Sequence, residues 1–101
     1  MDRIDMMRAF RAVAKAEGFA PAARELGLST SALSRQIAAL EDWLGTQLFH
    51  RTTRQVRLTA AGASYLEQCS RILGAVRDME LAASGATQEL TGTLRITAPA
   101  L

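Results

Sequence analysis

The sequence predicts a mainly helical fold in which three helices and a β-hairpin are followed by one long helix. Apolar residues recur at helical spacing over the first 45 residues, a short alternating stretch follows, and a heptad-like repeat then continues to about residue 84. The chain has 101 residues, of which 49% are hydrophobic and 22% charged. This length and composition are typical of one globular domain with a modest core, to which a small appendage can be attached.

The first two helices are expected before residue 27. The first is Asp2–Ala16, and its buried stripe consists of Met6 or Met7, Phe10, Val13 and Ala14. Gly18 breaks this helix, and Phe19 is expected to pack the turn into the core. A short second helix, Pro21–Leu26, begins at a proline that suits a first helical position, and Gly27 ends it.

The third helix is predicted between Ser29, a good N-cap, and Gly45, a good C-terminal stop. Its apolar stripe consists of Leu33, Ile37, Leu40 and Leu44, and a separate, small and hydroxylic face consists of Ser31, Ser34, Arg35 and Ala38. Two short helices joined by a tight turn, the second with such a face, form the pattern of a DNA-reading helix-turn-helix. The alternative is an ordinary amphipathic helix with a solvated polar face.

A β-hairpin is expected after the third helix. Leu48 and Phe49 precede a turn-like stretch from Arg51 to Arg54, and apolar residues then alternate with Arg57. No acidic residue occurs between Asp42 and Glu67, so this is the most basic part of the chain. An arginine-tipped hairpin can act as a wing that enters a narrow minor groove or follows a nucleic-acid backbone.

The long helix is predicted at residues 60–84, with Thr59 as its cap. Its heptad seam consists of Tyr65, Cys69, Ile72, Val76, Met79 and Ala83. Such an apolar seam suggests pairing with a second copy of the chain, and we assign dimerisation to the first five of these residues. The alternative is that the helix folds back onto the first three helices.

Three segments are therefore expected: a DNA-binding domain at residues 1–59, a linker helix at 60–84, and a tail at 85–101. Residues 84–92 are loop-like, and residues 93–99 alternate as a strand that has no partner strand in this chain. We expect the tail to be a hinge followed by the first strand of a domain that this chain does not contain.

Several classes of protein and site are not expected. Cys69 is the only cysteine, which excludes an intramolecular disulfide and a cysteine-based metal site. His50 is the only histidine and has no obvious nucleophilic partner, so we expect no catalytic residues, metal or cofactor. The N-terminus lacks a signal-peptide pattern and no apolar run is long enough to span a membrane, which favours a cytoplasmic protein.

The stretch FAPAARELGLSTSALSRQIAALEDWLGTQLFHRTTRQVRLTAAG resembles the N-terminal DNA-binding domain of LysR-type transcriptional regulators. The matching residues are Ala22, Ala23, Leu26, Ser34, Arg35, Gln36, Ile37, Leu40, Glu41, Leu44, Gly45, Leu48, Phe49, Arg51, Arg54, Leu58, Thr59 and Gly62. The resemblance implies a winged helix-turn-helix and a linker helix that pairs antiparallel in a dimer. The tail, GTLRITAP, is similar to the family's entry into an effector-binding domain.

The resemblance also implies roles for single residues. Thr30, Ser31, Ser34 and Arg35 match positions that contact the major groove; the helical-face argument selects the last three independently. Arg51 matches a position that contacts the DNA backbone, and Arg54 matches the wing arginine of the minor groove.

Two residues depart from the family's usual pattern. Ala20 stands where Ser or Thr usually caps the second helix, which lowers the expectation of a phosphate contact there. Ala60 stands where Glu is common, which removes a favourable charge near the start of the linker helix.

Double-stranded DNA and a second copy of the chain are the partners that these observations favour. The resemblance implies that the DNA site is an interrupted dyad, bound by a homodimer, or by a tetramer when the protein is full length. RNA polymerase is a further candidate partner. The resemblance implies that a small-molecule inducer binds the absent C-terminal domain. The rival hypotheses are a helical adaptor that binds protein, which would leave the acid-free basic stretch unexplained, and an enzyme, for which the sequence offers no set of catalytic residues.

Overall fold

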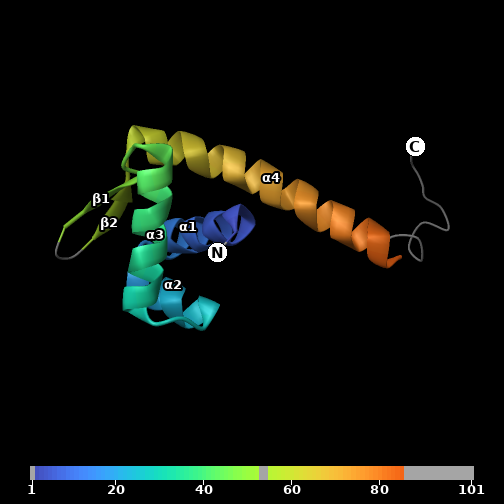
Figure 1. The fold of residues 1–101 in the computed structure, drawn as a ribbon, viewed down its shortest axis with the longest axis horizontal. Helices are drawn as coiled ribbons and strands as arrows, with labels where there is room; N and C mark the ends of the chain where they lie inside the picture. Colours follow the sequence, from blue (N-terminus) through green and yellow to red (C-terminus); the bar gives the residue numbers. More distant parts are fainter. Residues whose placement is uncertain (1, 53–54, 86–101) are drawn as a thin grey trace. The chain divides into compact units, whose positions relative to one another are not determined.

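The computed structural model of the chain describes residues 2–52 and 55–85. The elements follow in the order α1 (Arg3–Ala16), α2 (Phe19–Leu26), α3 (Thr30–Leu44), β1 (Phe49–Arg51), β2 (Val56–Leu58) and α4 (Ala60–Ser84) (Figure 1). The predicted fold class, a mainly helical winged helix-turn-helix followed by a long helix, is confirmed. The strand predicted at residues 93–99 lies outside the described residues.

Helix α1 has nearly the predicted bounds. The carboxylate of Asp2 accepts a hydrogen bond from the Asp5 N–H at 2.7 Å, so Asp2 is the N-cap of the helix and not its first residue. At the other end α1 stops at Ala16, as predicted, and Glu17 adopts a left-handed conformation with φ 56°, so the break lies one residue before the predicted breaker, Gly18.

Helix α2 begins two residues earlier than predicted, at Phe19, which corrects the assignment of Pro21 to the first helical position. The proline ring is tolerated at the third position because the N–H groups of the first turn have no acceptor within the helix. Gly18 is the N-cap and makes no side-chain capping bond. Ala20 therefore lies inside the first turn, which corrects the expectation that its position caps the helix.

Helix α3 has the predicted bounds. The Ser29 hydroxyl accepts the Ala32 N–H at 3.1 Å, and Gly45 has a φ of 71°, which glycine adopts without the steric cost that a Cβ would add. The Gly45 N–H donates to the Glu41 carbonyl at 2.8 Å and closes the helix. The predicted stripe faces inward: Leu33, Ile37 and Leu40 are buried and Leu44 is partly buried.

The hairpin is antiparallel, and Phe49, His50 and Arg51 pair with Leu58, Arg57 and Val56. Arg51 lies within β1, which corrects its prediction as part of the turn. The neighbouring Thr52 N–H donates to the carbonyl of Gln55 at 2.9 Å. Residues 53 and 54, at the tip, lie outside the described residues.

An aromatic cluster joins the helices to the hairpin. The Phe10 ring lies 5.1 Å from that of Phe49 and 5.2 Å from that of Tyr65, between centroids. Phe19 meets Phe49 edge-on at 6.2 Å, so it packs into the core as predicted. Because these rings come from α1, α2, β1 and α4, the cluster fixes the hairpin relative to the helices.

Residues 1–71 and 72–101 form two units, so the division falls inside α4. In the first unit Tyr65, Leu66 and Cys69 pack with the core, and Cys69 is 1% exposed. In the second unit Ile72, Met79 and Leu81 are exposed. Among the described residues, no helix combines the length and apolarity that a membrane span requires. The predicted boundary at residues 59 and 60 stays a prediction.

Candidate nucleic-acid interface

The outer face of α3 carries the side chains that the sequence assigns to the major groove. Thr30, Ser31 and Arg35 are exposed, and Ser34 is partly buried. They are held outward because the buried stripe of the same helix faces the core. Arg35 makes no hydrogen bond or ion pair to another residue in the described ranges, so its guanidinium is available to a ligand.

The N-terminal turn of α3 favours an anion. It contains no acidic residue, and the exposed amide N–H groups of a helix N-terminus carry partial positive charge. The Ser31 hydroxyl lies 3.4 Å from the Ser29 hydroxyl, which itself caps the helix. Asp42 is exposed near the opposite end, so the face is suited to a polyanion only in its N-terminal half.

Arg51 does not extend freely from the hairpin. Its Nη2 atom lies 3.2 Å from Oε1 of Glu41 on α3, and its guanidinium carbon lies 5.0 Å from the centre of the Phe19 ring. The side chain still has 38% of its surface exposed, against 14% for Glu41. Arg51, which the sequence assigns to the DNA backbone, therefore has a guanidinium that Glu41 and Phe19 already hold on one side.

Glu41 is the site residue that sequence reasoning missed. In the sequence it stands out only as part of the family pattern, yet its Oε2 atom accepts N–H bonds from Leu48 at 2.8 Å and Phe49 at 3.2 Å. These partners follow α3 in the chain and become neighbours through the turn after Gly45. One sequence signal could have pointed to Glu41. No acidic residue follows Asp42 until Glu67, so Glu41 and Asp42 are the carboxylates that directly precede the basic stretch.

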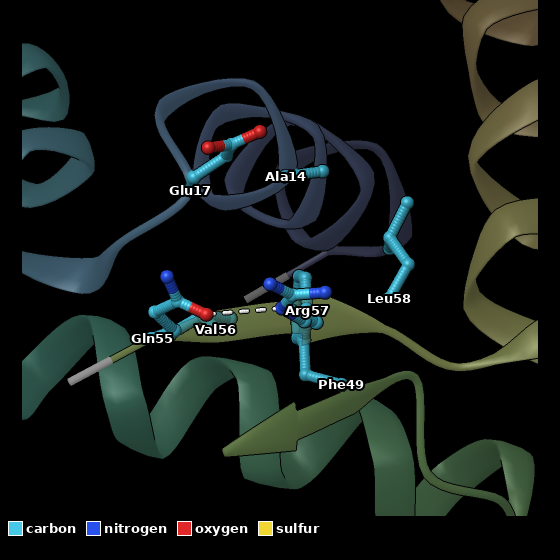
Figure 2. A pocket seen from close by; sticks show the side chains of 7 residues that line it. All are labelled: Ala14, Glu17, Phe49, Gln55, Val56, Arg57 and Leu58. Carbon is cyan, nitrogen blue, oxygen red and sulfur yellow. Dashed lines mark hydrogen bonds between the residues drawn. The ribbon is translucent and has the colours of Figure 1, made fainter. Parts of the chain in front are cut away.

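The hairpin also exposes a histidine and a further arginine. His50 and Arg57 are exposed cross-strand partners, and the Arg57 Nε donates to Oε1 of Gln55 at 3.0 Å. Figure 2 shows Gln55 and Arg57 beside a hollow of about 460 Å³ that is lined by Ala14, Glu17, Phe49, Gln55, Val56, Arg57 and Leu58. Glu17 makes no ion pair within the described residues, so its carboxylate would repel a phosphate, and we do not assign this hollow to nucleic acid.

The remaining predicted site residues fall into three groups. Arg54 lies outside the described residues. Tyr65 and Cys69 pack into the core of the first unit, so Cys69 has little surface left for a partner helix. Ile72 and Met79 are exposed and Val76 is partly buried, and their role in dimerisation stays a prediction.

Tyr65 and Cys69 are also the two groups with shifted acidity. Burial, followed by the charge and hydrogen bond of Cys69, raises the pKa of Tyr65 to about 12. Burial also raises the pKa of the Cys69 thiol, although the hydrogen bond from Tyr65 and the charge of Arg11 oppose the shift. A neutral, buried thiol is a poor nucleophile. The described part of the chain contains no group of three or more potential metal ligands.

Comparison with known proteins identifies the family. Residues 4–63 match the family model described as "Bacterial regulatory helix-turn-helix protein, lysR family". The chain is 39% identical over 99 residues to the uncharacterized HTH-type transcriptional regulator YhjC of Escherichia coli (strain K12), covering 98% of this chain and 33% of that protein. It is 43% identical over 90 residues to a probable hydrogen peroxide-inducible genes activator of Mycobacterium xenopi, covering 89% and 48%. The chain thus spans a third to a half of these relatives.

Solved structures agree with this result. A CbnR_DBD–DNA complex matches with a TM-score of 0.75 and 39% identity, over 85% of this chain and 99% of that one. A complex of BenM_DBD with catB site 1 DNA matches with a TM-score of 0.77 and 31% identity, over 92% of this chain and 100% of that one. Both structures are more than 30% identical to this chain in sequence, so the similarity extends beyond the fold. The chain belongs to the LysR family of bacterial helix-turn-helix regulators.

Proposed function

We propose that this chain is the DNA-binding part of a LysR-type transcription regulator and that it recognises double-stranded DNA in a sequence-specific way. The observation that carries the proposal is the exposed N-terminal face of α3, where Arg35 lies beside hydroxyl groups and has no partner within the described residues. The DNA complexes of CbnR_DBD and BenM_DBD support it, because both have this fold. We propose no catalytic activity, and the cytoplasmic setting stays a prediction.

The proposed mechanism separates affinity from specificity. Arg51 and the amide groups at the start of α3 would contact phosphates, which supplies affinity that falls steeply with salt, and Arg54 would enter the minor groove. Arg35 would read a base edge, with Thr30, Ser31 and Ser34 beside it. A good bidentate contact to a base discriminates against the wrong base by about 1–3 kcal/mol.

We further propose that two copies pair through α4 and bind an interrupted dyad. Support comes from the exposed apolar side chains of Ile72 and Met79 in the second unit, which a partner helix would cover. Two reading heads of such a dimer would lie about 34 Å apart, or a multiple of that distance, in successive major grooves. Tetramer formation, an inducer domain and contact with RNA polymerase belong to the full-length protein and are proposals on family grounds.

The test is a salt series of fluorescence anisotropy on two duplexes. One carries a dyad from DNA upstream of the protein's own gene, and the other carries the same bases in scrambled order. We expect the wild type to prefer the dyad and Arg35→Ala to lose the preference, by a free-energy difference of about 1–3 kcal/mol. Arg8→Ala is the matched control, because Arg8 is an exposed arginine of α1.

Two other outcomes of this experiment would contradict part or all of the proposal. Equal binding of both duplexes by the wild type would mean that the fragment holds DNA through charge alone. Absence of binding at low salt would contradict the DNA proposal and favour a protein-binding adaptor.

A further inference from the structure

We propose that Glu41 is a positioning residue for DNA binding, which holds the Arg51 guanidinium in the orientation that contacts a phosphate. The inference rests on the proposed function and deepens it, because it assigns a role to a carboxylate within the basic site. The family resemblance assigns no such role to this residue. Three observations carry it: the division of the Glu41 oxygens, a second anchor on Arg51, and the electrostatic cost of an acid at this place.

The two carboxylate oxygens of Glu41 have different partners. Oε2 accepts both backbone N–H groups at the start of β1, from Leu48 at 2.8 Å and from Phe49 at 3.2 Å. Oε1 faces Nη2 of Arg51 at 3.2 Å. One oxygen therefore ties the hairpin to α3, and the other is left to orient the guanidinium. Charge-assisted bonds of this kind are stronger than neutral ones.

A second anchor restricts the same guanidinium. Its central carbon lies 5.0 Å from the centre of the Phe19 ring, which in turn packs edge-on against Phe49. An arginine offers five N–H donors in a planar fork. Within the described residues Arg51 uses only Nη2, so the outer part of the fork is free for a phosphate. Restricting the fork in advance lowers the entropy that binding would otherwise cost.

The surroundings provide a place for the phosphate. A hollow of about 450 Å³ is lined by Glu41, Gln47, Phe49, His50, Arg51 and Thr52. Its lining includes the single histidine and the guanidinium of Arg51 together with one carboxylate. A carboxylate so close to a polyanion would by itself weaken binding through repulsion. The presence of this carboxylate is explained if orienting Arg51 favours DNA binding by more than the repulsion of its charge opposes it.

The sign of the effect of Glu41→Gln on DNA affinity distinguishes a positioning role from simple repulsion. Glu41→Gln keeps one oxygen for the two amides of β1 but replaces the atom that faces Arg51 with an NH₂ group, which cannot accept from a guanidinium. If Glu41 were only a repulsive charge, its removal would tighten DNA binding. If it positions Arg51, Glu41→Gln should instead raise the Kd about tenfold, the equivalent of one charge-assisted hydrogen bond. The slope of log K against log salt should also become shallower by about 0.9, the value of one lost phosphate contact.

Asp42→Asn is the matched control. It removes the same charge from the next residue of α3, where the carboxylate is exposed and has no hydrogen bond or ion pair within residues 2–52 and 55–85. We expect Asp42→Asn to tighten binding by about twofold and to leave the slope no shallower, because only a repulsion is lost. Glu41→Gln behaving like Asp42→Asn would overturn the proposal.

Arg51→Lys provides a second test that does not depend on how Glu41→Gln folds. Lysine keeps the charge but loses the planar fork that two anchors can orient. The proposal predicts a shallower salt slope for Arg51→Lys and no further loss when Glu41→Gln is added to it. A slope equal to that of the wild type would contradict it. Circular dichroism of each variant verifies folding, and Arg51→Lys decides alone if Glu41→Gln loses its helical signal.

The proposed function and the role of Glu41 can fail independently of each other. If the wild type binds no duplex, DNA binding itself is wrong for this chain. If the wild type binds and the variants give the contrary signs, DNA binding stands and Arg51 acts as an ordinary surface charge.

Discussion

Tyr65 is a single residue whose environment can be measured directly, because the chain contains no other tyrosine. Burial and Cys69 raise its pKa to about 12, from an ordinary value of 10.0. The unfolded chain therefore releases the phenol proton before the folded chain does. We predict that the free energy of unfolding is unaffected by this group below pH 10 and declines as the pH rises from 10 towards 12.

The measurement is a titration of tyrosinate absorbance in the near ultraviolet. Cys69→Ala should lower the midpoint towards 10 without reaching it, because burial, the larger cause, remains. A wild-type midpoint at the ordinary value would show that the ring is hydrated and that the aromatic cluster is looser than described.

At the scale of elements, the junction between the hairpin and α4 depends on one glycine. Thr59 donates its N–H to the Leu48 carbonyl at 2.9 Å and caps α4 by accepting the Gly62 N–H at 2.9 Å. A Cβ added at Gly62 would overlap the carbonyl oxygen of Leu48. Helix propensity alone favours alanine over glycine by about 1 kcal/mol. We predict that Gly62→Ala nevertheless destabilises the protein, by about 1–3 kcal/mol, because a backbone group must move.

Urea denaturation measures this effect. Gly74→Ala is the control on the same helix, since apart from its chain neighbours and the nearby backbone of α4 no described atom lies within 4 Å of the position its Cβ would take. It should stabilise the protein by about 0.5–1 kcal/mol, as expected for an unhindered helical site. Equal gains in the two variants would mean that α4 is not tightly packed on the hairpin.

The whole molecule is expected to work as a dimer, and α4 offers the surface for it. Met79 is 64% exposed and Ile72 is 42% exposed, and because they lie seven residues apart on one face of α4 they form an apolar surface that suits a partner helix. We predict that Met79→Lys raises the dimer dissociation constant at least about tenfold, because a charge would be buried against the partner helix. Sedimentation equilibrium measures the constant.

Ser70→Lys is the control for this prediction. It introduces the same charge at an exposed position of α4, nine residues before Met79 and so on the opposite side of the helix. Unchanged association in Met79→Lys would exclude this seam as the interface, whereas equal loss in both variants would point to a general effect of charge on the helix.

Local patterns predicted much of the fold. Ser29 and Gly45 marked both ends of α3, because a cap acts on N–H or C=O groups only a few residues away. The stripe of Leu33, Ile37 and Leu40 was equally readable, since helical spacing alone decides which residues share a face. The start of α2 was predicted two residues late, because a proline in the first turn is compatible with more than one position.

The sequence by itself therefore determined the family, the order of helices and hairpin, and the polar face of α3. All three can be read from patterns among residues that are close together along the chain. Only the tertiary structure decided that Cys69 lies in the core and that Arg51 is held by Glu41. The partners of Glu41 lie 7, 8 and 10 residues away, beyond the reach of helical periodicity. Such contacts depend on the direction that the chain takes after Gly45, and the packing of the Phe49 ring 5.1 Å from that of Phe10 is one of the contacts that hold it there.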